Sequence, residues 1–79
     1  MRILSQNERV MIDALRIKAC NDGSVIAECF NNDYIEIARY LNWNDARKVI
    51  KNMACFFVEN PDSVYFMPYS CEVDYLEEQ

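Results

Sequence analysis

A chain of 79 residues supplies one hydrophobic core and not two, because a polypeptide of this length buries only about 60 to 65 per cent of its unfolded surface. Hydrophobic residues make up 52% of the sequence, which argues against intrinsic disorder, and the apolar runs are too short to cross a bilayer. Because no apolar signal segment follows Met1, we expect residues 1–79 to form a single cytoplasmic domain with no membrane partner.

The net charge of −5 is unevenly distributed along the chain. All eight basic residues lie at or before Lys51, where seven acidic residues nearly balance them. Six acidic residues and no basic residue follow. Because neutralised phosphates supply most of the non-specific affinity for nucleic acid, only the first part of the chain suits a nucleic-acid surface. The two parts should therefore meet different partners.

The first part of the chain predicts a helix. Ser5 and Glu8 have the spacing of a capping box, in which two side chains satisfy the free N–H groups at a helix start. Gly23, the single glycine, would end this helix in a left-handed cap. Between them, apolar residues recur at helical spacing with charged residues interspersed: Val10, Met11, Ala14, Leu15 and Ile17.

Two further helices are predicted after a short strand over residues 24–30. The second helix spans about residues 33–42, because Asp33 and Glu36 repeat the capping-box spacing. Asn44 caps the third helix. Four apolar residues would lie on one side of that helix: Ala46, Val49, Ile50 and Met53.

The sequence after the third helix predicts a β-hairpin. Residues 55–59 and 64–67 are rich in aromatic and β-branched residues, and Pro61 and Asp62 favour a tight turn between them. Residues 70–79 alternate weakly between apolar and acidic side chains, which predicts an acidic carboxy-terminal strand or a tail.

The order of helix, short strand, helix, tight turn, helix and hairpin over residues 5–69 resembles the winged helix-turn-helix family. Ile37, Ala38 and Leu41 stand where the first helix of the bihelical core of this family packs. Asn42 stands where the family usually has glycine, and asparagine also accepts left-handed geometry. The resemblance implies an α+β fold with three helices and a small antiparallel β-hairpin or sheet.

The resemblance also implies a small DNA-binding regulatory protein whose third helix reads double-stranded DNA. In such a helix, Lys holds phosphates, and Arg or Asn contacts the edges of bases. The plain alternative is that the same residues form the solvated face of an amphipathic helix. The implied DNA-binding set is Arg39, Asn44, Arg47, Lys48, Lys51 and Asn52.

A rival hypothesis is an acidic protein–protein interaction module, such as a phage-type inhibitor or DNA mimic that occupies the basic groove of nucleic-acid-processing machinery. The predicted hairpin favours this hypothesis, because its turn carries carboxylates, which repel phosphates, and its strands carry no cation. Acidic tails are also commonly only solubilising, which leaves a purely solvated role open. The contacts of such a module would be Glu59, Asp62, Glu72, Asp74, Glu77 and Glu78.

Catalysis is not expected from this composition. The chain has no histidine, the usual general base near neutral pH, and its single glycine excludes a Gly-rich phosphate loop. Its four cysteines include no C-x-x-C pair, so we expect reduced, buried thiols, and neither a metal site nor a cofactor. If exposed, Val73, Tyr75 and Leu76 would allow a homodimer.

Overall fold

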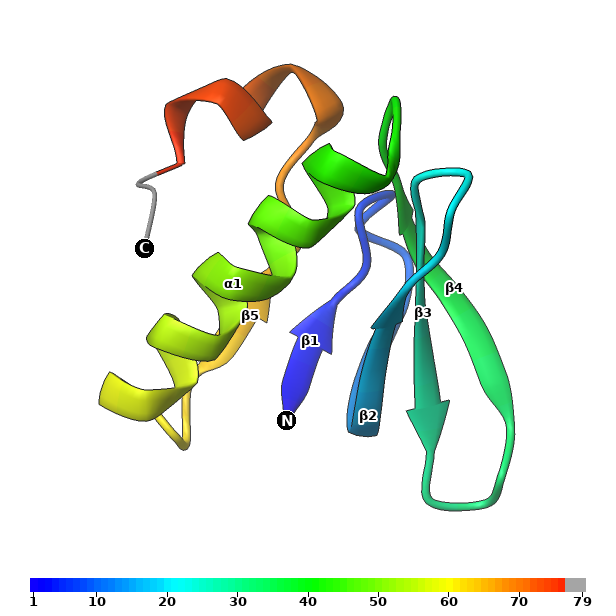
Figure 1. The fold of residues 1–79 in the computed structure, drawn as a ribbon. Coiled ribbons are helices and arrows are strands. Elements are labelled where there is room, and N and C mark those ends of the chain that lie inside the picture. Colours follow the sequence, from blue (N-terminus) through cyan, green and yellow to red (C-terminus); the bar gives the residue numbers. More distant parts are fainter. Residues whose placement is uncertain (77–79) are drawn as a thin grey trace.

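The computed structural model of the chain describes residues 1–76 and shows a sheet covered on one face by a helix (Figure 1). In this part of the chain, five strands accompany one α-helix and one short 3₁₀ helix. The elements are β1 (Arg2–Leu4), β2 (Met11–Ala19), β3 (Ser24–Cys29), β4 (Tyr34–Arg39), α1 (Trp43–Glu59), β5 (Val64–Phe66) and the 3₁₀ helix η1 (Ser70–Tyr75).

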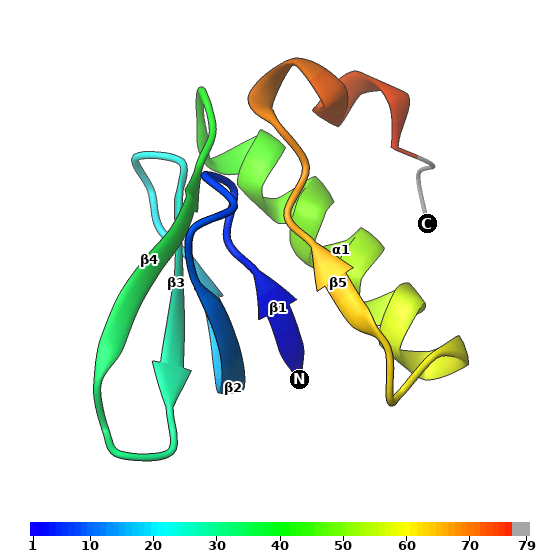
Figure 2. The same ribbon diagram turned by 180° about the vertical axis from the view of Figure 1, so that it is seen from behind.

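The strands form one mixed sheet in the order β4-β3-β2-β1-β5. β5 runs parallel to β1, and the other neighbouring pairs are antiparallel. In Figure 1, α1 lies in front of β5, and in the reverse view of Figure 2 it lies behind β5. The molecule therefore has two layers, and the second face of the sheet carries no helix in the described residues.

Two β-bulges set the curvature of the sheet. Leu15 is an extra residue in β2, because Ala14 pairs with Cys29 and Arg16 pairs with Glu28. Ile37 is likewise an extra residue in β4, because Glu36 pairs with Ile26 and Ala38 pairs with the preceding residue, Val25. A bulge bends its strand and increases the local twist, so β2 and β4 both curve.

The curvature brings β4 back to the segment that follows β1, although the two lie three strands apart in the sheet. The N–H of Gln6 donates to the carbonyl of the bulged residue Ile37 at 2.7 Å. Because a bulge leaves its extra residue outside the regular ladder, this carbonyl needs a partner from elsewhere. The sheet is thus curled enough for β4 to contact the segment that follows β1.

The core lies between the concave face of the sheet and α1. α1 contributes Ala46, Val49 and Met53, which recur at helical spacing and are buried. The Tyr65 ring packs edge-on against Phe56 at 5.3 Å between ring centroids. The other buried apolar residues are Ile3, Ala14, Val25, Ala27, Ile37, Ala38, Tyr40, Met67 and Val73.

The winged helix-turn-helix expectation is wrong, because a five-stranded mixed sheet with one main helix replaces the three helices and small hairpin. The predicted first helix is β2, and the predicted second helix over residues 33–42 is largely β4. Ser5 and Glu8 do not cap a helix: the Glu8 N–H donates to the Ser5 carbonyl in a tight turn, and the Ser5 hydroxyl accepts from Val10 N–H.

The predicted hairpin is also wrong. Residues 55–59 form the last turns of α1, and β5 pairs with β1 instead of with them. Residues 70–75 form a 3₁₀ helix rather than a strand or a tail, and residues 77–79 lie outside the described residues. The turn at residues 60–63 does form, with Ser63 N–H donating to the Asn60 carbonyl.

Two local predictions are confirmed. The third predicted helix is α1, although its N-cap is Asn42, whose side chain accepts from the Asp45 N–H at 2.9 Å. The strand predicted over residues 24–30 is β3. None of the helices among the described residues has the length and apolar character that a transmembrane span requires.

Replacing Gly23 with alanine tests the tight turn between β2 and β3. Gly23 has a φ of +92°, and a Cβ built there would lie 2.3 Å from the Tyr40 carbonyl oxygen, which is backbone. We expect Gly23→Ala to lower the free energy of unfolding by more than about 2 kcal/mol, and the melting temperature by on the order of 10 °C. Thermal and urea unfolding, followed by circular dichroism, measure both.

Asn32 provides the matched control, since it also has a positive φ of 69° but lies in an exposed turn. Asn32→Gly should leave stability within about 0.5 kcal/mol of the wild type or raise it slightly. A Gly23→Ala protein as stable as wild type would show that this turn does not approach the Tyr40 backbone.

Candidate functional site

The predicted DNA-binding residues are only partly brought together. Arg39 belongs to β4, where its guanidinium lies 2.7 Å from Glu36 and 3.5 Å from Asp22, so two carboxylates balance its charge. Asn52 turns toward the sheet and accepts a hydrogen bond from the Tyr65 hydroxyl at 2.6 Å. These two residues therefore do not lie together with the other four.

The other four residues of that set share the outer flank of α1. At 100° per residue, Asn44, Arg47, Lys48 and Lys51 all lie opposite the buried stripe; Lys48 is half-buried and the other three are exposed. Arg47 lies over the Trp43 ring at 5.6 Å, and no ion pair within the described residues involves a cation of α1. The geometric condition for a basic helix face is therefore met, without a helix-turn-helix around it.

The predicted acidic contacts do not form one surface. Glu59 and Asp62 lie at the carboxy-terminal end of α1, whereas Glu72 and Asp74 belong to η1, beyond the other end of α1 (Figure 1). Glu77 and Glu78 lie outside the described residues. A DNA mimic requires a continuous line of carboxylates, and the four that lie within the described residues do not form one.

The residues expected to support a homodimer are also separated. Val73 is buried and Leu76 is half-buried against the core. Tyr75 alone is exposed, at 87% of its accessible surface. The buried Val73 anchors η1 to the core, so this segment does not offer a separate apolar dimer face.

An apolar row crosses the outer face of the sheet, the face opposite α1. Phe66 of β5, Leu4 of β1 and Met11 of β2 are direct cross-strand partners. Phe66 is 68% exposed and Met11 is 59% exposed. Directly opposed side chains on one face are close neighbours, so these three residues form one continuous apolar strip.

A hollow of about 280 Å³ opens at one end of this row. Leu4 and Phe66 line it, so the hollow and the row share two side chains. Its remaining lining comes from the segments before β2 and after β5, and includes two carboxylates and no cation: Ser5, Glu8, Met67, Pro68, Tyr69 and Glu72.

The two carboxylates are tied to Tyr69. The Tyr69 hydroxyl donates to Glu8 Oε2 at 2.6 Å, and the Tyr69 N–H donates to Glu72 Oε1 at 2.8 Å. The hydrogen bond to Glu8 raises the pKa of Tyr69, with smaller contributions from burial and from the charges of Glu8 and Glu72. The Tyr69 hydroxyl therefore stays protonated near neutral pH and holds Glu8 at the rim of the hollow.

Glu8 is also fixed by its own loop. Its φ is +62°, a left-handed conformation that residues other than glycine and asparagine seldom adopt. The Ser5 hydroxyl donates to Asn7 Oδ1 at 2.6 Å and accepts from Val10 N–H, while Asn7 Oδ1 accepts from Arg9 N–H. These hydrogen bonds close the loop and hold Glu8 in position before any ligand arrives.

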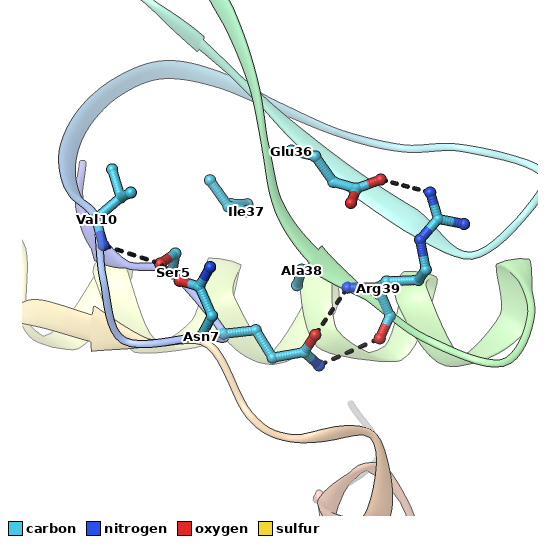
Figure 3. Close-up of a pocket in the computed structure, with 8 residues that line it drawn as sticks. Ser5, Asn7, Val10, Glu36, Ile37, Ala38 and Arg39 are labelled. Carbon is cyan, nitrogen blue, oxygen red and sulfur yellow. Dashed lines mark hydrogen bonds and ion pairs between the residues drawn. The ribbon is translucent and has the colours of Figure 1, made fainter.

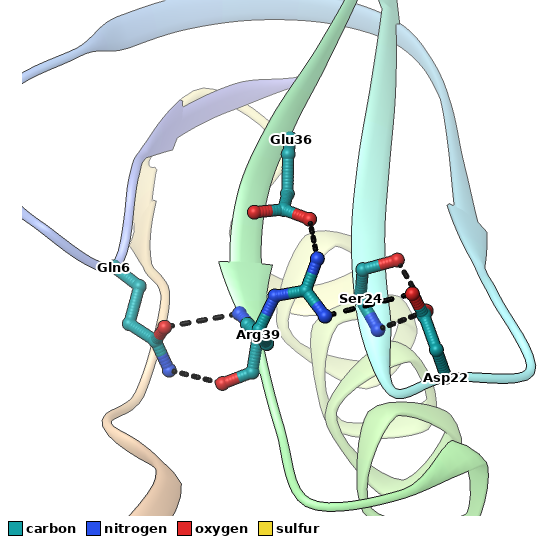
Figure 4. Close-up of polar contacts among 5 residues, drawn as sticks. All are labelled: Gln6, Asp22, Ser24, Glu36 and Arg39. Atoms are coloured by element: carbon teal, nitrogen blue, oxygen red, sulfur yellow. Dashed lines mark hydrogen bonds and ion pairs between the residues drawn. The ribbon is translucent and has the colours of Figure 1, made fainter.

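A second, smaller cavity of about 110 Å³ lies between this loop and β4 (Figure 3). The side-chain amide of Gln6 crosses it: Oε1 accepts from the Arg39 N–H at 3.0 Å and Nε2 donates to the Arg39 carbonyl at 3.2 Å. The Arg39 guanidinium lies against Glu36 and Asp22, and Asp22 accepts in turn from Ser24 (Figure 4). Because these groups satisfy one another, we assign this cluster to the closure of the sheet.

A third hollow, on β2, β3 and β4, is lined by charged residues that also pair with one another. Arg16 lies 3.2 Å from Glu28, and Glu28 accepts from the Tyr34 hydroxyl at 3.1 Å. That hydrogen bond is the main cause of the raised pKa of Tyr34. The charge of Glu28 is thus balanced within the sheet.

The four cysteine thiols are free. Three are half-buried and Cys71 is exposed, so the expectation that all four are buried is wrong. Within residues 1–76, no group of three potential ligands is placed to hold a metal ion.

Comparison with known proteins finds no matching family model, no matching curated protein and no matching solved structure.

The sequence did not predict a functional role for the residues of the outer row and its hollow, apart from Glu72. Met11 was expected at an apolar position of a helix and Phe66 in a strand of the hairpin, and Leu4 was not expected to have a role. No local signal could have joined them, because β1 and β5 pair across about sixty residues. Glu8 was expected to cap a helix and instead belongs to the hollow.

Exchanging Gln6 for glutamate tests the amide that closes the sheet. Gln6 Nε2 donates to the carbonyls of Arg39 and Pro68, and a carboxylate of the same shape would oppose both oxygens. We expect Gln6→Glu to cost about 1 to 3 kcal/mol at pH 7. The loss should shrink as the pH falls through the raised pKa of the new carboxyl, because the protonated form donates one hydrogen bond again.

Urea unfolding between pH 3.5 and 7.5, with wild type as the reference at each pH, measures this effect. Asn21→Asp is the matched control, since it makes the same change of amide to carboxylate in an exposed turn. A Gln6→Glu protein whose deficit is constant across this pH range would contradict the role of the donated hydrogen bonds.

Proposed function

We propose that the chain is a protein–protein interaction module that binds its partner through the apolar row Phe66–Leu4–Met11 and the adjoining hollow. The observation that carries this proposal is the register that aligns these three side chains on the uncovered face of the sheet. Single exposed apolar residues are ordinary, but a continuous row that ends in a hollow is typical of binding surfaces.

The energy available from this surface is substantial for so small a protein. Burial of one large apolar side chain contributes about 1.5 to 3 kcal/mol. Phe66 and Met11 are both more than half exposed, so a partner that covers the row recovers most of that contribution from each. The helix on the opposite face gives the strands a rigid support.

Side-chain docking fits the surface better than addition of a strand to the β5 edge. β5 has three residues, and Pro68, which has no N–H, follows two positions after Phe66. A short edge strand next to proline offers few backbone hydrogen bonds, and proteins use both features to block strand addition. The partner is therefore expected to contact the outer face.

Charge indicates the kind of partner. Glu8 and Glu72 stand at the hollow, no cation lines it, and the whole chain carries a net charge of −5. A partner surface with apolar and basic side chains complements both features. The proposed function therefore keeps the acidic interaction module that the sequence suggested. It does not keep the DNA mimic, because the other described carboxylates are dispersed. Four free thiols fit a cytosolic place for it.

The first test removes the row without disturbing the core. Phe66→Ser combined with Met11→Ser should reduce capture of the specific partner from a lysate of the source cells by at least about tenfold. Quantitative mass spectrometry of the captured proteins measures the loss, and circular dichroism checks that the variant folds.

Val58→Ser is the matched control, because Val58 is an apolar residue on the outer flank of α1 that is even more exposed than Phe66 or Met11. It should leave capture unchanged. Capture of the same partner at wild-type levels by the double variant would refute the proposed surface.

A second candidate function is binding of double-stranded DNA by the outer flank of α1. The specific observation in its favour is that Arg47, Lys48 and Lys51 share this flank with no ion pair in the described residues. Without a helix-turn-helix or a basic wing, such binding would rest on phosphate contacts and would carry little sequence specificity.

This candidate predicts a defined salt dependence. Three cations that each neutralise one phosphate give a slope of about −2.7 for the logarithm of affinity against the logarithm of salt concentration, and Arg47→Ala with Lys51→Ala should flatten it by about 1.8. Fluorescence anisotropy with a labelled 20-base-pair duplex between 50 and 200 mM salt measures the slope.

Lys18→Ala, on the outer face of β2, is the control and should leave the affinity within about twofold of wild type. A wild-type protein with no measurable duplex affinity at about 50 mM salt would exclude this second candidate.

A further inference from the structure

We infer that the hollow beside Phe66 receives a lysine or arginine side chain of the partner, held between aromatic faces and the carboxylates of Glu8 and Glu72. This inference rests on the proposed function and names the chemistry that the same surface recognises. It adds a charged anchor to the apolar row.

The size of the hollow suits one side chain. At about 280 Å³ it lies just below the usual range for small-molecule sites, roughly 300 to 1,000 Å³. Its lining is apolar toward the sheet, where Leu4 and Phe66 contribute, and Pro68 and Tyr69 add apolar surface from the segment after β5. A long side chain with an apolar stem and a polar tip matches this division.

The electrostatics select a cation for that tip. Glu8 and Glu72 each use one carboxylate oxygen to accept from Tyr69, and no hydrogen bond within residues 1–76 uses the second oxygen of either group. Neither carboxylate has an ion-pair partner in the described part of the chain. A bound guanidinium or ammonium group would supply the missing donors, and charge-assisted hydrogen bonds are about twice as strong as neutral ones.

The aromatic rings favour the same ligand. Phe66 and Tyr69 both line the hollow and keep much of their surface exposed. A cation over an aromatic face gains about 0.5 to 2 kcal/mol according to its desolvation. An anion would gain from neither the rings nor the carboxylates, so the lining discriminates against acidic partners.

The site is organised before binding. The strained loop at Glu8 and the first turn of η1 at Glu72 are far apart in sequence, and their hydrogen bonds to Tyr69 fix them on either side of one residue. Because little ordering is left for the moment of binding, even a small ligand should show the preference.

The test uses three small probes of similar shape: n-butylguanidinium, neutral butyramide and butyrate. Each is titrated into the 79-residue protein while NMR follows the ring signals of Phe66 and Tyr69. We expect n-butylguanidinium to bind at least about fivefold more tightly than butyramide, and butyrate to bind more weakly than both.

Glu72→Gln and Glu8→Gln should each reduce the preference for the cation to about twofold or less, because the uncharged amide keeps the shape and loses the charge. Asp74→Asn is the matched control, since Asp74 is an exposed acid of the same 3₁₀ helix that does not line the hollow. It should keep the full preference. Glu72→Gln alone decides the outcome if the strained loop does not tolerate Glu8→Gln.

Equal affinity for n-butylguanidinium and butyramide, or a preference that survives Glu72→Gln, would overturn the inference. If partner capture still depends on Phe66 and Met11 in that case, the apolar interaction module stands and only its cationic anchor is lost. If the cation preference is present but capture ignores the row, the proposed function fails and the recognition of a cation by the hollow stands.

Discussion

Gln6 is the residue at which the curled sheet and the segment after β5 meet, through three hydrogen bonds of one amide group to Arg39 and Pro68. The Tyr40 hydroxyl reaches the same Pro68 carbonyl at 2.8 Å, and burial raises the pKa of Tyr40 well above its usual range, so it remains a donor. Two residues after Gln6, Glu8 is joined to Tyr69. Pro68, Tyr69 and Glu8 line the hollow, so these contacts help to fix its shape.

The sequence predicted the parts of the fold in which local pattern and final structure agree. α1 has a regular apolar stripe, which was readable in the sequence, whereas its N-cap is Asn42 and not the predicted Asn44. β2 was misread because its bulge moves the inward side chains from a spacing of two to a spacing of three, as at Ala14 and Ile17. A spacing of three is also typical of a helix, so the apolar pattern of a bulged strand was mistaken for that of a helix. β4 was misread because Asp33 and Glu36 have the spacing of a capping box, although Asp33 lies just before the strand and Glu36 within it.

The candidate site was less predictable than the fold, for a different reason. The row Phe66–Leu4–Met11 depends on the pairing of β1 with both β5 and β2, and β1 and β5 are each only three residues long. Segments so short carry no alternation that could be recognised in the sequence. The cations of α1 were predictable as a group, because helical spacing alone decides that Arg47 and Lys51 share a flank. A surface formed by one helix can be predicted from the local sequence. A surface formed across several strands can be predicted only when the pairing register of the strands is known.

The two candidate surfaces lie on opposite layers of the molecule, and this separation has an electrostatic consequence. The smallest dimension of the molecule is 19 Å, about two Debye lengths at physiological salt. The field of the α1 cations is therefore weakened by screening at the outer face of the sheet, where Phe66, Leu4 and Met11 lie. The net charge of −5, which acts within about a Debye length of the surface, attracts basic partners and repels polyanions. The approach of a basic, partly apolar partner is thus favoured both by the net charge and by the carboxylates of the hollow, whereas duplex DNA must overcome the net charge to reach α1. This difference favours the protein interaction over duplex binding.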